Sequence, residues 1–313
     1  MLDVLMVVLP VFLIVGAGYG GVRIGSFTAP AIDGLLAYTI RFAIPILLFR
    51  AMVTLDLEQA FDLRLLASFY AGALGCFFAT MALARLVFGR RPGESAAIGF
   101  SALFSNTVLL GLPIIERAFG AASMTPAFSI VAVHAPICYL VGITTMEIVR
   151  RDGASATATA KRAAKAMFSN ALTIGIVAGL ALNFAQVPLP EFLMAAVGLV
   201  AASGLPAALF ALGGALTRYA VRDDLGEAVT AALMAVIVHP LVVWALATQV
   251  FDLSLDMTRA AVVLASMPAG MNAYVFAAMY DRAQGAAASA VLIGTALAVF
   301  TATFWLWLIG LAA

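Results

Sequence analysis

Charged residues are scarce in this sequence. Of its 313 residues, 11% are Asp, Glu, Lys or Arg, whereas 64% are hydrophobic. A soluble domain carries about 25% charged and about 45–50% apolar residues, so a water-soluble fold of this length could not bury so much apolar surface. The net charge is +1, which provides no basic surface for nucleic acid. The sequence therefore predicts an integral membrane protein, with the lipid bilayer as its surroundings.

Cysteine and histidine are also rare. Cys76 and Cys138 both fall within apolar segments, where we expect packed thiols rather than a disulfide. With two histidines and no clustered ligand spacing, we expect neither a metal site nor a cofactor. No Ser/His/Asp order, P-loop, zinc-protease motif or dinucleotide motif occurs. We therefore expect a protein that is not an enzyme and that does not use ATP within this chain.

Long apolar runs are what the sequence does contain. A helix needs about 20 mostly apolar residues to cross a bilayer, and ten such runs are separated by charged residues, proline or glycine. Their approximate bounds are 2–22, 31–53, 64–88, 95–119, 123–148, 167–186, 190–217, 225–250, 258–281 and 286–311. The first run lacks a basic n-region and is too long for a signal peptide, so we expect a retained membrane helix.

One connection differs from the others. Residues 150–165 are basic and rich in Ala, Thr and Ser, which is typical of a surface linker. The linker, taken as 150–166, separates a first part, 1–149, from a second part, 167–313, and each part holds five runs. Because five is odd, two parts related by duplication would have inverted orientations in the membrane.

A shift of 161 residues gives weak support to such a duplication. It places the motif PILLF, Pro45–Phe49, on PAALF, Pro206–Phe210, and Gly18 on Gly179. The same shift pairs the fourth run with the ninth. We therefore predict an all-α fold, with ten membrane helices in two inverted five-helix repeats.

Basic residues are unequally distributed between the connections. Twelve of the seventeen Lys and Arg residues follow the odd-numbered runs, and four follow the even-numbered ones. Basic connections stay in the cytoplasm. The linker at 150–165 is thus predicted to be cytoplasmic, with both termini on the opposite face of the membrane.

The fourth run is interrupted in its middle by the stretch FSNTVLLGLPII. It holds the polar residues Ser105, Asn106 and Thr107, followed by Gly111 and Pro113. Proline removes a helix hydrogen bond, and glycine permits backbone angles that other residues avoid. Backbone groups freed in this way need partners, since the hydrocarbon core holds no water.

The ninth run has a similar interruption at Pro268, Gly270 and Asn272. A single kinked helix is more often structural, and several other runs contain proline. A pair of interrupted runs in corresponding positions of two halves, however, indicates a transporter substrate site. A broken helix exposes N–H donors with partial positive charge, which suits an anion, and the asparagine amides add donors and acceptors.

Three motifs resemble those of the auxin efflux carrier family. SNTVLLGLPIIERAFG is similar to the fourth-helix motif of that family, RFAIPILLF to its second helix, and MPAGMNAYVFAAMYD to its ninth. They occur in the family order and the resemblance spans nearly the whole chain. The short linker resembles bacterial members, which are associated with malonate and other dicarboxylates. The third run lacks the carboxylate and lysine of plant members, so proton-coupling roles placed there do not transfer.

The resemblance implies a secondary carrier of small organic anions, mono- or dicarboxylates. It further implies that helices 4 and 9 cross near mid-membrane, that an elevator-like motion gives alternating access, and that the protein is a homodimer. The implied substrate residue is Asn106, and Pro113, Pro268 and Gly270 match crossing positions. A channel or a solute sensor with the same fold is the alternative. The identity of the anion, the direction of transport and any ion coupling remain open.

Three further polar residues lie inside apolar runs. Arg41 either faces a cavity, where it could bind a carboxylate, or reaches the membrane interface. His134 and His239, each near a proline, are candidates for proton coupling, although a structural hydrogen bond is the commoner role. The predicted substrate-binding set is Ser105, Asn106, Thr107, Gly270, Asn272 and Arg41.

Overall fold

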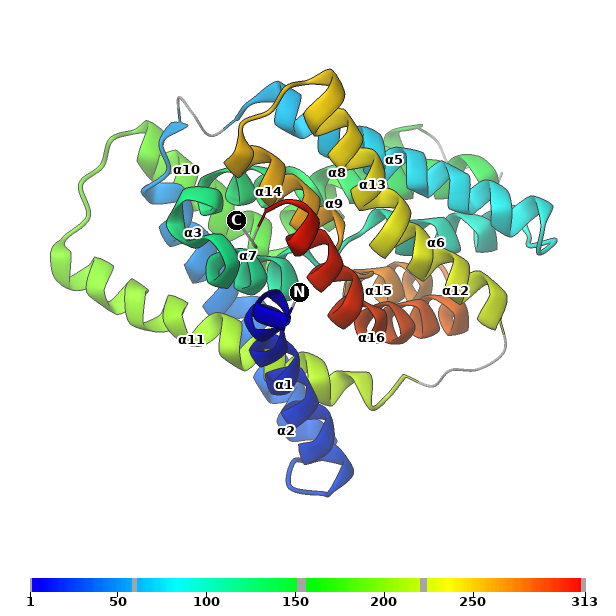
Figure 1. The fold of residues 1–313 in the computed structure, drawn as a ribbon, viewed down its shortest axis with the longest axis horizontal. Helices are drawn as coiled ribbons and strands as arrows, with labels where there is room; N and C mark the ends of the chain where they lie inside the picture. The colour runs from blue at the N-terminus through cyan, green and yellow to red at the C-terminus, as the bar shows by residue number, and fades with distance from the viewer. Residues whose placement is uncertain (1, 58–60, 151–155, 220–223, 311–313) are drawn as a thin grey trace.

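The computed structural model describes residues 2–57, 61–150, 156–219 and 224–310. All regular elements in these ranges are helices, of the α, π or 3-10 type (η), apart from one isolated backbone bridge (Figure 1). The elements are α1 (Leu2–Arg23), α2 (Ala29–Tyr38), η1 (Thr39–Ala43), α3 (Ile44–Val53), α5 (Leu63–Leu86), α6 (Pro92–Leu103), η2 (Thr107–Gly111), α7 (Leu112–Phe119), η3 (Gly120–Ser123), α8 (Met124–Arg150), α9 (Ala156–Phe168), α10 (Ala171–Phe184), α11 (Glu191–Leu216), α12 (Leu225–Leu233), η4 (Met234–Val238), α13 (His239–Ala245), η5 (Leu246–Val250), α14 (Leu255–Ala265), α15 (Met271–Met279) and α16 (Gln284–Leu308).

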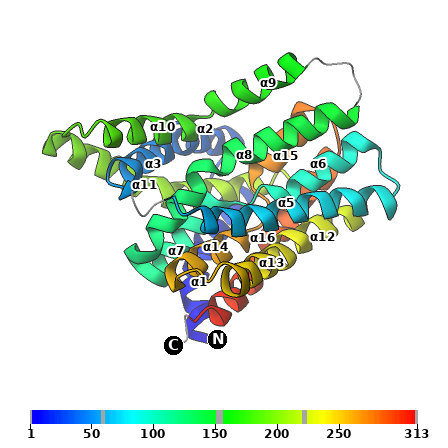
Figure 2. The same cartoon turned by 90° about the horizontal axis from the view of Figure 1, so that it is seen from above.

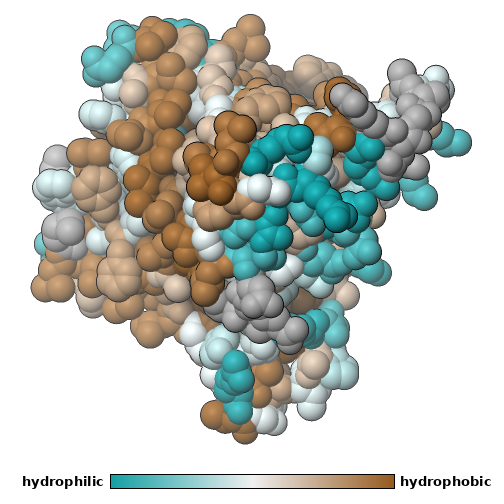
Figure 3. Space-filling view, turned by 90° about the vertical axis from the view of Figure 1, so that its right-hand side faces the viewer, coloured by the Kyte–Doolittle hydropathy of each residue, from teal (hydrophilic) through white to brown (hydrophobic). Residues whose placement is uncertain are grey.

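Seven helices in the described ranges are long and apolar enough to cross a membrane. The other three apolar runs form shorter helices: α10 has 14 residues, and the runs of α6–α7 and α14–α15 are each divided by an interruption. The predicted all-α membrane architecture is confirmed at this level. Large apolar side chains such as Leu86 and Leu199 are exposed, at 83% and 78%. Figure 3 shows such apolar side chains gathered over a broad part of one face, which suits contact with lipid.

Most of the predicted linker is helical. Ala156–Phe168 forms α9, and α10 begins at Ala171, four residues later than the expected start at 167. Alanine has the highest helix propensity, so this alanine-rich stretch is helical although it lies outside the apolar runs. Arg151–Ser155 fall outside the described residues.

Three π-turns lead directly into α-helices that have a proline near their start. The turns are η1, η2 and η4, and each ends two residues before a proline, at Pro45, Pro113 and Pro240 respectively. Proline has no N–H and its ring clashes with the carbonyl one turn earlier, so a wider turn relieves the clash. These prolines therefore widen their helices, and the chain remains helical through them.

The helices form two groups. The first helix group comprises α1, α2, α3, α10 and α11, in which α1 packs on α11 and α3 on α10. The second helix group comprises α5 to α8 and α12 to α16, including their short η segments. In Figures 1 and 2, α3, α10 and α11 lie on one side of the molecule and α5, α6, α12 and α16 on the other.

Glycines allow the closest approaches inside the first helix group. A Cβ on Gly18 of α1 would overlap the carbonyl oxygen of Phe210 in α11. A Cβ on Gly179 of α10 would meet the carbonyl oxygen of Phe49 in α3 in the same way. Both helix pairs therefore pack backbone against backbone at these glycines.

Candidate functional site

The interruptions of the fourth and ninth runs cross and pair with each other. The Asn106 amide donates to the Pro268 carbonyl at 2.8 Å, and the Gly270 amide donates to the Phe104 carbonyl at 2.9 Å. Ser105 and Ala269 thus form an isolated antiparallel bridge. Some of the backbone groups released by the two breaks are thereby satisfied.

The structure corrects three expectations from the sequence. Two of the backbone N–H groups that were expected to be free for an anion are bonded across the crossing. Gly270 has φ −77° and ψ 165°, an extended conformation open to any residue, so its presence is not explained by unusual backbone angles. The break itself lies at 104–106 rather than at Gly111 and Pro113, which lie in and after the π-turn η2.

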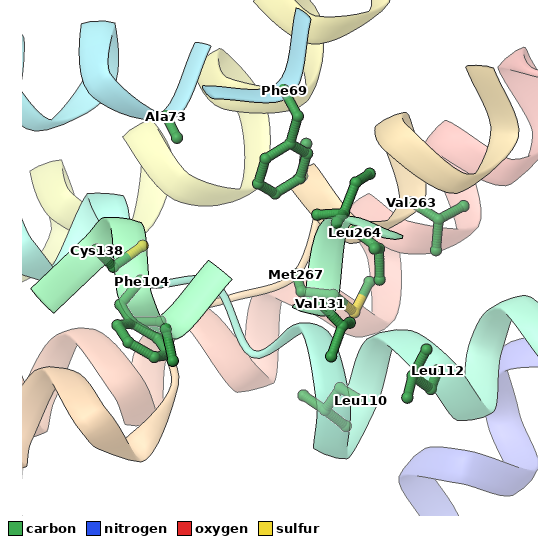
Figure 4. Packing of buried hydrophobic residues seen from close by; sticks show 14 of the residues in the cluster. Phe69, Ala73, Phe104, Leu110, Leu112, Val131, Cys138, Val263, Leu264 and Met267 are labelled. Carbon is green, nitrogen blue, oxygen red and sulfur yellow. The ribbon is translucent and has the colours of Figure 1, made fainter. Parts of the chain in front are cut away.

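Small and apolar residues hold the crossing together. A Cβ on Gly111 would lie 2.5 Å from Leu264 Cδ2, so this glycine gives η2 a close approach to α14. Around the same region, Leu110, Val131 and Met267 are buried (Figure 4). The crossing is therefore a packed element, and the Pro268 carbonyl forms part of its backbone pairing.

A cavity of about 90 Å³ lies at the crossing. A single water needs roughly 10–15 Å³ on the same measure, so the cavity has room for a small organic molecule. None of the described residues that line it carries a charged side chain, and much of the wall is apolar, for example Ile40, Ile44 and Ile176. Its polar lining residues are Ser105, Asn106, Thr107, His134, Asn170, Thr173 and Asn272.

Asn106 is the polar group best placed for a ligand. It directly precedes η2, its carbonyl accepts from the amides of Leu110 and Gly111, and the residue is only 7% exposed. Within the described part of the chain, its side-chain amide has no hydrogen-bond partner. The amide lines the cavity, where a ligand or a water can pair with it.

Asn272 and Ser105 add to this wall of the cavity. Asn272 lies in the first turn of α15, and its Oδ1 accepts from the Tyr139 hydroxyl at 3.2 Å. The amide nitrogen of Asn272 is then left as a donor. The Ser105 hydroxyl is buried and has no partner among the described residues. The Thr107 amide donates to the Ser105 carbonyl and the Ala273 amide to the Gly270 carbonyl. The other first-turn N–H groups of η2 and α15 have no acceptor within their helices, which gives the crossing a partial positive charge.

The two histidines differ in position. His134 lines the cavity, and its ring lies 4.9 Å from that of Phe104. His239 is buried away from the lining residues, with Nε2 at 3.3 Å from the Phe69 carbonyl. The Phe69 ring contacts both imidazoles, at 5.7 Å and 5.0 Å between centroids. Only His134 therefore belongs to the site.

Arg41 is not brought to the cavity. It lies in η1 with its side chain exposed, whereas its neighbours Ile40 and Ile44 line the cavity. The guanidinium thus lies on the outer surface of the first helix group.

A second cavity of about 660 Å³ contains charged groups. Arg50, Glu116 and Arg117 line it, and Arg117 Nε also donates to the Val7 carbonyl at 3.1 Å. Along α3, residues at the start face the crossing cavity and residues at the end face this second cavity. The same order holds from η2 to α7, so the two cavities lie at opposite ends of these helices.

Sequence reasoning missed three residues of the site. Tyr139 is a lone polar ring in an apolar run, and nothing in its spacing marked it. Asn170 and Thr173 were assigned to the interior of a run that began at 167. The signal that could have found them is Asn170 itself, since asparagine is a preferred N-cap residue and its Oδ1 accepts from the Leu172 amide at 3.0 Å.

The family model described as "Membrane transport protein" (Mem_trans) matches residues 3–306. The chain therefore belongs to this family, that of the auxin efflux carriers, which confirms the resemblance of its motifs. With its several apolar helices it is a multi-pass membrane transport protein. A similar protein is the "Putative malonate transporter" of Rhizobium meliloti (strain 1021), 24% identical over 316 residues, which cover 99% of this chain and 97% of that protein.

Proposed function

We propose that this protein is a secondary carrier of small organic anions and that it binds a substrate carboxylate at the crossing. The observation that carries this proposal is the Asn106 amide, which lines the crossing cavity without a partner among the described residues. A carboxylate would accept from Asn106 and from the N-terminal amides of η2 and α15. Neutral donors suit a carrier, because the anion must also leave.

A short-chain carboxylate is the proposed substrate, with malonate as the first candidate. The size of the cavity and its partly apolar wall limit the ligand to a few carbon atoms. The similar protein from Rhizobium meliloti is named as a malonate transporter. For proton coupling, His134 is the candidate because it lines the cavity, whereas His239 does not.

We propose alternating access by relative motion of the two helix groups, in an elevator-like manner and within a homodimer. In support, the start of α3 and η2 line the crossing cavity, whereas the end of α3 and α7 line the second cavity. The lining of each cavity draws on both helix groups. A shift of one group against the other would therefore change which cavity connects to the substrate.

Two inverted five-helix repeats, 1–149 and 167–313, are part of the proposal. The contact of Gly18 with the Phe210 carbonyl matches that of Gly179 with the Phe49 carbonyl. Adding 161 to Gly18 gives Gly179, and subtracting 161 from Phe210 gives Phe49. A pseudo-two-fold axis between the repeats would produce such paired contacts, and it supports ten membrane helices in all.

The proposed location is the inner membrane of a bacterium, with both termini periplasmic and the linker cytoplasmic. The distribution of basic residues supports this orientation. The crossing cavity then faces the cytoplasm, since Asn170 and Thr173 follow the linker closely.

Counterflow distinguishes a carrier from the alternative, a channel or a solute sensor. Proteoliposomes loaded with unlabelled malonate would be diluted into a trace of labelled malonate. A carrier accumulates the label transiently because the same site exchanges the two pools, and its uptake saturates. Non-saturating uptake without accumulation would indicate a channel, and binding without uptake would indicate a sensor.

A further inference from the structure

The crossing cavity has a second polar wall that the crossing itself does not supply. This wall is the first turn of α10, a helix of 14 residues that packs on α3 in the first helix group. Asn170, Leu172 and Thr173 from this turn all line the cavity. Polar groups of the two helix groups thus face one common space, in which Ile44 and Ile176 form part of the remaining wall.

The hydroxyl of Thr173 is the observation that points to a ligand here. Thr173 is 6% exposed, and its Oγ1 has no hydrogen-bond partner among the described residues. Threonine in a helix normally donates to a carbonyl one turn earlier, as Thr295 does to Val291 at 2.7 Å. The Thr173 hydroxyl is therefore available as a donor. Rotation about its Cα–Cβ bond would let it donate to a ligand in the cavity.

The N-terminus of α10 adds partial positive charge at the same place. Asn170 caps the Leu172 amide, which leaves the other first-turn amides of the helix without intrahelical acceptors. A negative group is stabilised there.

Resting on the proposed function, we propose that α10 binds the second carboxylate of a dicarboxylate such as malonate, through Thr173 and the helix N-terminus. The first carboxylate pairs with Asn106 at the crossing, and the short methylene link lies against the apolar wall. A monocarboxylate fills only the crossing half. Thr173 and Asn170 are then the residues that set the preference for dicarboxylates.

Binding of malonate and propionate to the purified protein tests this inference. Propionate has a methyl group in place of the second carboxylate of malonate. Thr173→Val keeps the side-chain shape and removes the donor, so malonate affinity should fall about 10-fold or more while propionate affinity stays within about twofold. Asn170→Asp keeps a good N-cap residue but adds a negative charge, and it should weaken malonate more than propionate.

Thr80→Val is the matched control. The Thr80 hydroxyl is also buried without a partner among the described residues, but it lies in α5 and does not line the cavity. Unchanged malonate affinity in Thr173→Val, or an equal loss for both ligands, would overturn the inference while the crossing site stands. Failure of the wild-type protein to bind either ligand would instead reject the proposed function, and this inference with it.

Discussion

At the scale of single residues, the position of a polar side chain in the fold decides whether it can bind the substrate. Its position inside an apolar run does not. Asn106 and Arg41 both lie inside apolar runs, and both were candidates for binding an anion. The structure places Asn106 in the cavity and the Arg41 side chain on the outer surface of η1. The neutral amide of Asn106 is thus the candidate substrate-binding group, and the guanidinium of Arg41 is not.

Arg41→Gln should leave malonate affinity unchanged within about twofold, because the guanidinium lies outside the site. Titration of the purified variant by calorimetry or thermal shift measures this. A tenfold loss that Arg41→Lys did not show would mean that the positive charge at this position acts on the bound anion, in another arrangement of the helix groups.

At the scale of helices, two glycine contacts set the spacing of the first helix group. A methyl group on Gly18 has no room against the Phe210 carbonyl, and a backbone atom cannot move aside as a side chain can. Gly20 lies two residues further along α1, and a Cβ there would meet nothing within 4 Å. Alanine substitutions at these two positions therefore distinguish the effect of close packing on stability from the effect of helix propensity.

Gly18→Ala should destabilise the protein by about 1–3 kcal/mol, the usual range for overpacking. Gly20→Ala should be neutral, or more stable by up to about 1 kcal/mol, because alanine is the better helix former. Thermal unfolding of both variants in detergent measures the difference. Equal melting temperatures would contradict the close packing of α1 on α11.

The sequence predicted the apolar runs, the two interruptions and the pairing of the fourth run with the ninth. It misplaced the break in the fourth run. Proline usually breaks a helix, but here the π-turn η2 precedes Pro113 and the chain stays helical through this proline. Hydrogen bonds between residues more than 150 positions apart, such as Asn106 to Pro268, have no local signal. The same is true of Thr173, whose place in the cavity depends on how α10 packs against α3.

At the scale of the whole molecule, the proposed inverted repeat requires opposite faces for the linker and for the loop between α10 and α11. Thr157 in α9 and Val187 in that loop are exposed. The native cysteines, Cys76 and Cys138, are buried and give little background. Thr157→Cys should react with an impermeant maleimide only from the cytoplasm, and Val187→Cys only from the periplasm. Labelling of both from one side would exclude this topology.

The central claim is that an anion binds to Asn106 at the crossing, and malonate affinity of Asn106→Leu tests it most directly. Loss of one donor to a charged ligand costs about 1.5–3 kcal/mol, or roughly 10- to 150-fold in affinity, and leucine also fills the space. Gln249→Leu removes an exposed amide that does not line the cavity and serves as the control. We predict that Asn106→Leu folds like the control but neither binds nor transports malonate. Wild-type affinity in Asn106→Leu would contradict the account, and the crossing would then be a structural joint between the two helix groups.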